Sequence, residues 1–205
     1  MNNALERSKA AHFKRIYGMD YGEAAKRRLA VFTPSSTMFD KCVGLFSMRK
    51  NEGWYATALG DSLLAVRILQ GASSSLFFSH FSRAPAALFL GYAYSSLLEC
   101  GGIFTTNSAS YFNGRLFKRS KELKPFPGID KILPMLTVSD PFFSAVIRDG
   151  CIDMESFYFA SAFGKRGSGL FLVSDDMQSV YSRHVSAAAM DAFIKKILDG
   201  VEDAL

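Results

Sequence analysis

The sequence predicts an α/β fold: a single domain with a mostly parallel, twisted central sheet and helices on both of its faces. Two observations predict it. Short continuous apolar runs, typical of strands buried on both faces, alternate along the chain with segments in which apolar residues have helical spacing. The 205 residues, 49% of them hydrophobic and 21% charged, are also enough to bury one sizeable core. We find no internal repeat, low-complexity tract or second-domain boundary, so one domain is expected over residues 1–205.

The first third of the chain is predicted to alternate between helices and strands. Five segments are expected there: a helix over residues 4–26, strands over residues 29–32, 43–48 and 54–58, and a helix over residues 62–70. The first strand is a buried apolar run that Thr33 and Pro34 end. Asp61 is placed to cap the second helix, and Gly71 is placed to end it.

The rest of the chain continues the alternation. Further apolar runs lie at residues 76–81, 87–91, 103–106 and 135–138. The Lys-, Arg- and Pro-rich residues 115–127 are expected to form a surface loop. The C-terminal third has the clearest pattern, which predicts a helix over residues 154–165, a break at residues 167–169, a buried strand over residues 170–173 and a long helix over residues 180–198.

Composition excludes several classes of protein. The longest apolar stretch, residues 84–98, falls short of the ~20 residues that a membrane-spanning helix needs. The first residues are basic but are followed by neither an apolar run nor a small-residue cleavage site, so no signal peptide is predicted. The three cysteines form no Cys-x-x-Cys pair, and the three histidines have no zinc-binding spacing. We therefore expect a cytoplasmic enzyme or binding protein without disulfides, metal or organic cofactor.

The net charge of +5 comes from 24 basic and 19 acidic residues. Seven of the basic residues gather between Arg7 and Arg28. Such a cluster is either a phosphate-binding face or a solvated helix surface, and runs of this length are more often the second. Binding of small anionic or polar ligands explains the charge equally well, and neither nucleic acid nor a membrane is expected as a partner.

Ligands of such a sheet gather at the carboxyl ends of its strands, and two acidic residues are predicted to lie there. Glu155 opens the helix that leads to the final strand, and Asp175 ends that strand. Because this connection returns the chain to the same edge, two carboxylates can lie around one pocket. The simpler alternatives are that Glu155 is a helix N-terminal acid stabilised by the helix dipole and that Asp175 is the N-cap of the last helix.

Several segments resemble the nucleoside phosphorylase and nucleosidase superfamily, and most closely the methylthioadenosine/S-adenosylhomocysteine nucleosidases. The most specific is Asp153-Met-Glu155-Ser followed by Leu170-Phe-Leu-Val-Ser174-Asp175, which is similar to a Met-Glu pair before a helix and a Ser-Asp pair at the next strand end. Three upstream segments match in the right order: residues 88–96, 100–107 and 138–143. Together the resemblance covers roughly the second half of the chain.

The resemblance implies a role for each matching residue. Asp175 would donate a proton to the purine N7, and Glu155, as an ionised carboxylate, would accept hydrogen bonds from the ribose hydroxyls. Met154 would pack beneath the sugar, and Phe142 would stack on the base. The simpler alternative for Phe142 is that it is an ordinary core residue. Four further residues are expected to bind substrate: Asp153, Ser174, Tyr92 and Ala93. The family also implies a homodimer or larger homo-oligomer.

The chain departs from the family at three places, one of which is the Tyr92-Ala-Tyr94 turn, where the family has a small residue and a glycine. Nucleosidases of the family have a water-activating glutamate just after the first strand, where this chain has hydroxyl residues and no acid before Asp40. Family phosphorylases hold phosphate with an Arg where this chain has Phe89. Three hypotheses follow: a nucleosidase acting on a purine nucleoside or 5'-thio-nucleoside, a purine nucleoside phosphorylase that also binds phosphate, and a catalytically inactive nucleoside-binding relative. We favour the nucleosidase.

Overall fold

The computed structural model describes residues 2–50, 56–59, 62–140, 150–175 and 185–202, and the statements below concern those residues. The helices are α1 (Asn2–Tyr17), α2 (Tyr21–Lys26), α3 (Ser36–Leu45), α4 (Ser74–His80), α5 (Ser156–Phe163) and α6 (Ala187–Glu202), with 3-10 turns at η1 (Gly71–Ser73) and η3 (Gly164–Arg166). The strands are β1 (Leu29–Thr33), β2 (Arg49–Lys50), β3 (Ala56–Leu59), β4 (Leu63–Arg67), β5 (Ala86–Ser95), β6 (Ile103–Thr106), β7 (Ser108–Phe112), β8 (Phe117–Glu122), β9 (Met135–Val138), β10 (Cys151–Asp153) and β11 (Gly167–Asp175).

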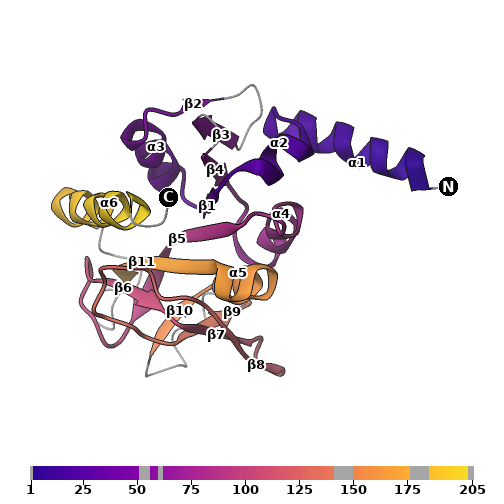
Figure 1. Ribbon diagram of the computed structural model, residues 1–205. Coiled ribbons are helices and arrows are strands. Elements are labelled where there is room, and N and C mark those ends of the chain that lie inside the picture. The colour runs from indigo at the N-terminus through magenta and orange to yellow at the C-terminus, as the bar shows by residue number, and fades with distance from the viewer. Residues whose placement is uncertain (1, 51–55, 60–61, 141–149, 176–184, 203–205) are drawn as a thin grey trace.

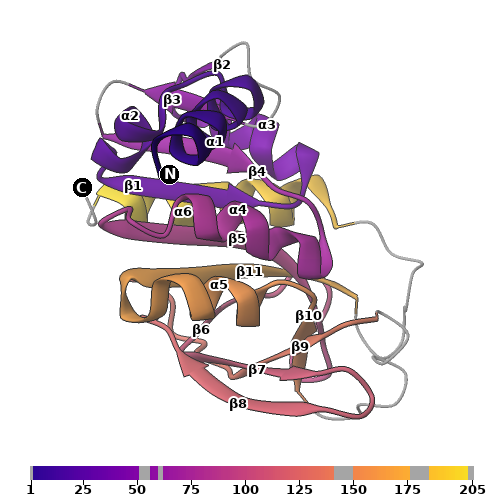
Figure 2. The same cartoon turned by 90° about the vertical axis from the view of Figure 1, so that its right-hand side faces the viewer.

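A mixed sheet with a parallel centre runs through the molecule (Figures 1 and 2). The long strand β5 pairs in parallel with β1 on one edge and with β11 on the other, and β1 pairs in parallel with β4. Antiparallel strands extend this centre, among them β3 beside β4 and β6 beside β11. The predicted α/β class and mostly parallel central sheet are confirmed.

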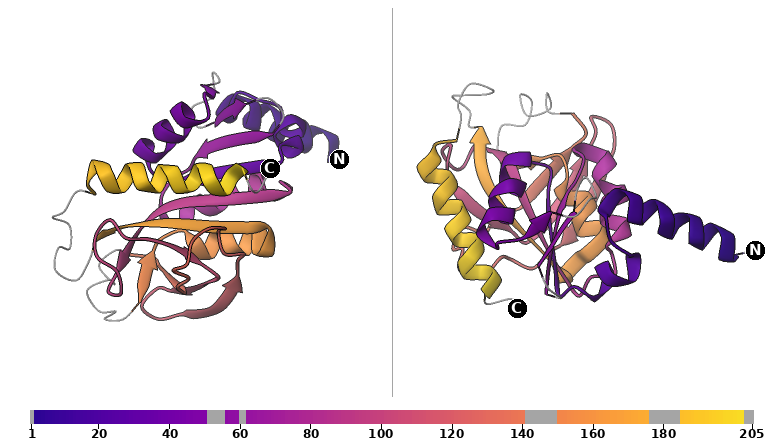
Figure 3. Two further views of the ribbon diagram at one scale, coloured as in Figure 1. Left: turned by 60° about the vertical axis from the view of Figure 1, so that its left-hand side comes forward. Right: turned by 90° about the horizontal axis from the view of Figure 1, so that it is seen from above.

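Helices cover both faces of the parallel centre, as predicted. On one face α4 and α5 pack in an aromatic core that includes Phe78, Phe89 and Phe159, and on the other α3 and α6 pack in an aliphatic core that includes Leu88 and Leu170 (Figures 1 and 3). Neighbouring residues of β5 contribute to opposite cores because side chains alternate along a strand. Helix α1 projects from the body, and near its own C-terminus it packs on Phe77 and His80 of α4 and on Phe81 directly after α4.

Two predicted elements have the wrong type, and one apolar run is assigned its type by the structure. The expected helix over residues 62–70 is strand β4, because its apolar residues Leu63 to Val66 are buried against the cores on both faces of the sheet. The expected strand over residues 43–48 begins inside α3, which Ser35 caps by accepting a hydrogen bond from the Met38 N–H. The apolar run at residues 76–81 belongs mostly to α4.

Other predictions need new boundaries. The helix expected over residues 4–26 is interrupted at Gly18, whose φ of 67° ends α1 before α2 begins. The break expected at residues 167–169 is instead the start of β11; a Cβ at Gly169 would lie 2.7 Å from the Phe171 ring, so glycine here serves close packing. The expected surface loop at residues 115–127 contains the exposed edge strand β8, and after it Leu123 and Phe126 are buried in the core. In the described residues α6 begins at Ala187, and residues 180–184 lie outside them.

Among the described residues, none of the helices combines the length and the apolar character needed to cross a bilayer.

Candidate functional site

The turn from β10 into α5 buries an aspartate with three hydrogen-bond donors. Asp153 ends β10 opposite Thr137 of the parallel strand β9. Its Oδ1 accepts a hydrogen bond from the Thr137 hydroxyl at 2.7 Å, and its Oδ2 accepts one from the Ser156 N–H at 2.8 Å and another from the Ser156 hydroxyl. Both carboxylate oxygens of a residue that is only 6% exposed are therefore engaged by protein groups.

These contacts also cap helix α5. The first N–H groups of a helix have no partner within it. Asp153 accepts from the first of them, that of Ser156, and Thr137 Oγ1 accepts from the next, that of Phe157, at 2.8 Å. Glu155 occupies the N-cap position but its side chain makes no capping hydrogen bond. The alternative in which Glu155 is only a helix N-terminal acid is thus incomplete, because its carboxyl points elsewhere.

The Glu155 carboxyl instead joins the β10–α5 turn to the loop after β4. Its Oε1 accepts a hydrogen bond from the Gly71 N–H at 2.6 Å, and the residue is 5% exposed. Gly71 has a φ of +64°, a conformation that favours glycine, and the Met154 methyl group lies 3.4 Å from where a Cβ would stand on Gly71. Met154 and Glu155 are therefore held against one buried glycine.

Burial of two neighbouring acids favours their neutral forms. Desolvation raises the pKa of Asp153 to about 6, against the effect of its hydrogen bonds with Ser156 and Thr137. Desolvation, together with the nearby charge of Asp153, raises the pKa of Glu155 to about 8. Because Asp153 has three donors, it is the member of the pair that stays ionised at neutral pH, and Glu155 retains its proton.

Asp175 lies at the carboxyl end of β11, as predicted. Its backbone pairs with Tyr94 of β5, after an irregularity at Ser174, and Tyr94 also pairs with Ile152 of β10. A strand residue that pairs twice has one partner on each edge, so β10 and the end of β11 flank β5, roughly 10 Å apart across two strand spacings. The Asp175 side chain lies outside the described part of the structure, as does all of Phe142.

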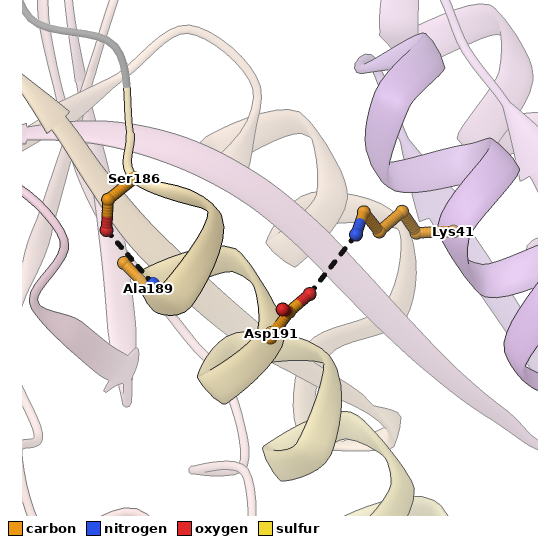
Figure 4. Close-up of polar contacts among 4 residues, drawn as sticks. All are labelled: Lys41, Ser186, Ala189 and Asp191. Atoms are coloured by element: carbon orange, nitrogen blue, oxygen red, sulfur yellow. Dashed lines mark hydrogen bonds and ion pairs between the residues drawn. The ribbon is translucent and has the colours of Figure 1, made fainter.

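Asp175 does not cap the last helix. In the described residues α6 begins at Ala187, twelve positions later, and Ser186 caps it by accepting a hydrogen bond from the Ala189 N–H at 3.1 Å (Figure 4). The interpretation of Asp175 as an N-cap is therefore wrong. Helix α6 therefore does not explain why an acid stands at the end of β11.

Tyr92 and Ser174 line an open pocket of about 480 Å³ near the carboxyl ends of β5 and β11. The other lining residues come from α3 and from the N-terminal side of α6: Thr37, Lys41, Val185, Ala187 and Met190. Lys41 forms an ion pair with Asp191 at 3.2 Å on the rim (Figure 4). Burial raises the pKa of the half-buried Tyr92, and a hydrogen bond with the Ser35 side chain opposes this shift.

The predicted site residues thus fall on two sides of the strand ends. Tyr92 packs against the aliphatic core on the α3–α6 side, where its pocket opens. Glu155 lies beside α5 and η1 on the other side, and Ala93 is buried in the aromatic core there. The carboxyl ends of β5 and β11 lie between these two groups.

The carboxyl end of β1 contains hydroxyl groups that bond to protein. The buried Thr33 hydroxyl donates to the Met38 sulfur at 3.7 Å and accepts from the Ser35 N–H at 3.2 Å. Among the described residues, Asp153 and Glu155 are the only buried acids, and no group of three or more His, Cys, Asp or Glu side chains there could hold a metal ion.

Sequence reasoning missed Thr137, Ser156 and Gly71. Thr137 is a polar residue inside an apolar strand, and Ser156 follows the Met-Glu pair directly. Both were visible signals, since a buried hydroxyl must find a partner. The contact between Gly71 and Glu155 spans 84 positions and has no local signal.

Comparison with known proteins finds the fold but no sequence family. No family model and no curated protein matches the chain. An AMP nucleosidase from Bacteroides thetaiotaomicron matches with a TM-score of 0.68 and 14% identity over 94% of each chain. A Campylobacter jejuni 5'-methylthioadenosine/S-adenosylhomocysteine nucleosidase matches with a TM-score of 0.66 and 12% identity, over 86% of this chain and 99% of that one. A Helicobacter pylori futalosine hydrolase matches with a TM-score of 0.62 and 12% identity, over 86% and 98%.

These neighbours confirm at the level of fold the resemblance that the motifs indicate. At identities of 12–14% they show architecture and leave the role of each residue to be argued from this chain. The protein has the α/β fold of the nucleoside phosphorylase and nucleosidase superfamily.

Proposed function

We propose that the protein is a nucleosidase that cleaves the N-glycosidic bond of a purine nucleoside or 5'-thio-nucleoside. The observation that supports it best is the buried Glu155, whose side chain makes no capping hydrogen bond and is oriented by the Gly71 N–H. Glu155 follows β10, which pairs with one edge of β5, and the other edge of β5 pairs with the end of β11 that contains Asp175. The solved neighbours whose titles name nucleosidases or a hydrolase of this fold support the same chemistry.

In the proposed reaction the base leaves as the sugar gains positive charge. Asp175 donates a proton to the purine, which makes the base a better leaving group. Glu155 accepts hydrogen bonds from the ribose hydroxyls, and its ionised form stabilises the developing positive charge. Met154 packs beneath the sugar, Phe142 stacks on the base, and Tyr92 and Ser174, which line the open pocket, border the remaining substrate surface. Ala93 is buried in the aromatic core and packs behind that surface.

The state of Glu155 makes sugar binding depend on pH. In the free protein, burial and the Asp153 charge raise the Glu155 pKa to about 8, so the carboxyl is mostly protonated at pH 7. Hydroxyl groups that donate to it favour the ionised form. Nucleoside binding therefore releases a proton, and affinity should rise as the pH increases towards about 8.

An inactive nucleoside-binding protein is the second candidate. The observation that favours it is the carboxyl end of β1, where the Thr33 hydroxyl is engaged by Met38 and Ser35 and no acid is available to activate water. Such a protein would bind the same ligands through the same residues. It would release no base.

The test is incubation with adenosine, inosine, methylthioadenosine or AMP, with and without phosphate, while free base is measured. The nucleosidase releases base without phosphate. Release only with phosphate would indicate the phosphorylase, and binding without release would indicate the inactive relative. Asp175→Asn should lower kcat by about 10²–10⁴-fold, the range for loss of a general acid, whereas Asp130→Asn, at an exposed position, is the matched control. Unchanged release by Asp175→Asn would remove the assigned acid.

The family resemblance further supports the proposal of a homodimer or larger homo-oligomer. Light scattering at micromolar concentration measures this directly. A monomer would contradict that part of the proposal and leave the chemistry untouched.

A further inference from the structure

Asp153 directly precedes the Met154-Glu155 pair, and this place in the chain suggests a contact with substrate. Its two carboxylate oxygens, however, already accept hydrogen bonds from the protein. Oδ1 is bonded by the Thr137 hydroxyl, and Oδ2 by both donors of Ser156. A carboxylate offers about four acceptor positions in total. With the Thr137 and Ser156 donors in place, Asp153 has few acceptor positions left for a nucleoside hydroxyl.

Its contacts instead determine where Glu155 can point. An acid at an N-cap position normally turns back to bond the N–H groups of the first turn. In α5 the N–H groups that an N-cap side chain would bond are those of Phe157 and Tyr158, and they already donate to Thr137 Oγ1 and to the Glu155 carbonyl oxygen, while Asp153 accepts from the Ser156 N–H before them. The Glu155 side chain is thereby left to reach Gly71, 84 positions away in the chain.

We propose that Asp153 is a positioning residue: it contacts no nucleoside, and by capping α5 together with Thr137 it directs the Glu155 carboxyl away from the helix and towards the sugar. The sugar-binding role of Glu155 is part of the proposed function, and the inference rests on it. The contacts among Asp153, Thr137, Ser156 and Gly71 are independent of it.

Asp153 also acts on Glu155 through its charge. The negative charge lies close enough to raise the pKa of Glu155 and so to favour its neutral form. Tyr158 of the same helix also interacts with Glu155, and burial raises the pKa of its hydroxyl, so it stays neutral. Tyr158 in turn bonds Tyr111, whose ring centroid lies 5.4 Å from the Lys118 ammonium. Among these described neighbours, Asp153 is the charged group that acts directly on Glu155.

The first experiment titrates Glu155 without needing turnover. The carboxyl ¹³C resonance of Glu155, assigned by its loss in Glu155→Gln, is followed against pH in the wild type and in Asp153→Asn. Asparagine keeps the shape and one acceptor but removes the charge. The Glu155 midpoint should fall in Asp153→Asn, because the nearby charge is removed, and stay unchanged in Asp130→Asn. An unchanged midpoint in Asp153→Asn would overturn the proposal.

The second experiment asks whether Asp153 acts through Glu155. With adenosine or methylthioadenosine, Asp153→Asn should lower kcat/KM by about 10²-fold, the cost of a displacement of about 1 Å. In a Glu155→Gln background the same change should cost nothing further, because the group it positions is gone. An equal loss in both backgrounds would indicate a direct substrate contact and overturn the proposal.

Two provisions distinguish a failure of the proposed function, or a variant that does not fold, from a failure of this inference. If the wild type releases no base, the proposed function fails while the ¹³C titration still decides the role of Asp153. If Asp153→Asn does not fold, Ser156→Ala replaces it. That variant keeps the N–H bond to Asp153 but loses the hydroxyl bond, so it should lower the Glu155 midpoint by a smaller amount. No shift in Ser156→Ala would then count against the proposal.

Discussion

Two strand-to-helix turns lead into the candidate site, and they use their polar groups in opposite ways. In the β1–α3 turn, Ser35 caps its own helix and Thr33 bonds Met38, so the helix is completed by neutral hydroxyls close in sequence. In the β10–α5 turn the caps are Asp153 and a threonine from another strand, which leaves the N-cap Glu155 free. When other residues cap a helix, the side chain of the residue at its N-cap position can turn towards a ligand instead.

The difference should appear most strongly in the pH dependence of folding. The pKa of Glu155 is raised to about 8 in the folded protein, so between its ordinary value and pH 8 the folded state binds more protons than the unfolded state. Stability therefore falls as the pH rises through this window, by up to about 1.4 kcal/mol per pH unit. Glu155→Gln removes this loss. Urea unfolding at pH 5, 6.5 and 8 should show a variant curve that is flatter than the wild-type curve.

The difference between the wild-type and Glu155→Gln curves removes the contributions of the other titrating groups to the pH dependence of stability, because both proteins contain those groups. Asp153 contributes a loss of the same sign below about pH 6, and His80, whose pKa burial lowers, contributes the opposite sign in both proteins. The β1–α3 turn contains no acid, so Ser35→Ala should leave the shape of the wild-type pH curve unchanged. Parallel curves for wild type and Glu155→Gln would show that Glu155 is solvated in the folded protein.

The same contrast explains which features could be predicted from the sequence. The strand over residues 170–173, the helix after the Met-Glu pair and the acidic strand end at Asp175 follow from local periodicity and from motifs. Their mutual placement does not follow from the rule for parallel strands, because β10 runs antiparallel to β5 whereas β11 runs parallel to it. The motifs give the position of each acid in the chain, and the pairing of Ile152 and Asp175 with Tyr94 brings the two strand ends to opposite edges of β5.

Features that depend on distant packing could not be predicted. Leu63 to Val66 fits a broad helical face as well as a strand buried on both sides, and only the cores on both faces decide between them. Gly167 and Gly169 suggest a break until the aromatic rings that cover them are known. The side that Tyr92 faces, away from Ala93, depends on strand register, which a motif does not contain.

The two threonines provide a matched pair. Thr137→Val removes a donor to a buried carboxylate and the acceptor for the Phe157 N–H, which should cost about 2–4 kcal/mol of unfolding free energy. Thr33→Val removes a weak bond to sulfur and an acceptor for the partly exposed Ser35 N–H, which should cost about 1 kcal/mol or less. Chemical denaturation at pH 7 measures both. Equal costs would mean that the β10–α5 network contributes no more than ordinary capping.

The smallest effect is expected at Ser35. Loss of its hydroxyl removes the N-cap of α3, which should cost about 1 kcal/mol of unfolding free energy, and Ser36→Ala at the exposed next position is the control. Because the Ser35 side chain also holds the pKa of Tyr92 below the value that burial alone would produce, Ser35→Ala should raise that pKa. Absorbance of tyrosinate at 295 nm, with Tyr92→Phe to identify the titration, measures the shift. If stability falls but Tyr92 titrates as before, the β1–α3 turn is a purely structural cap; if both change, its hydroxyls also control a side chain of the candidate pocket.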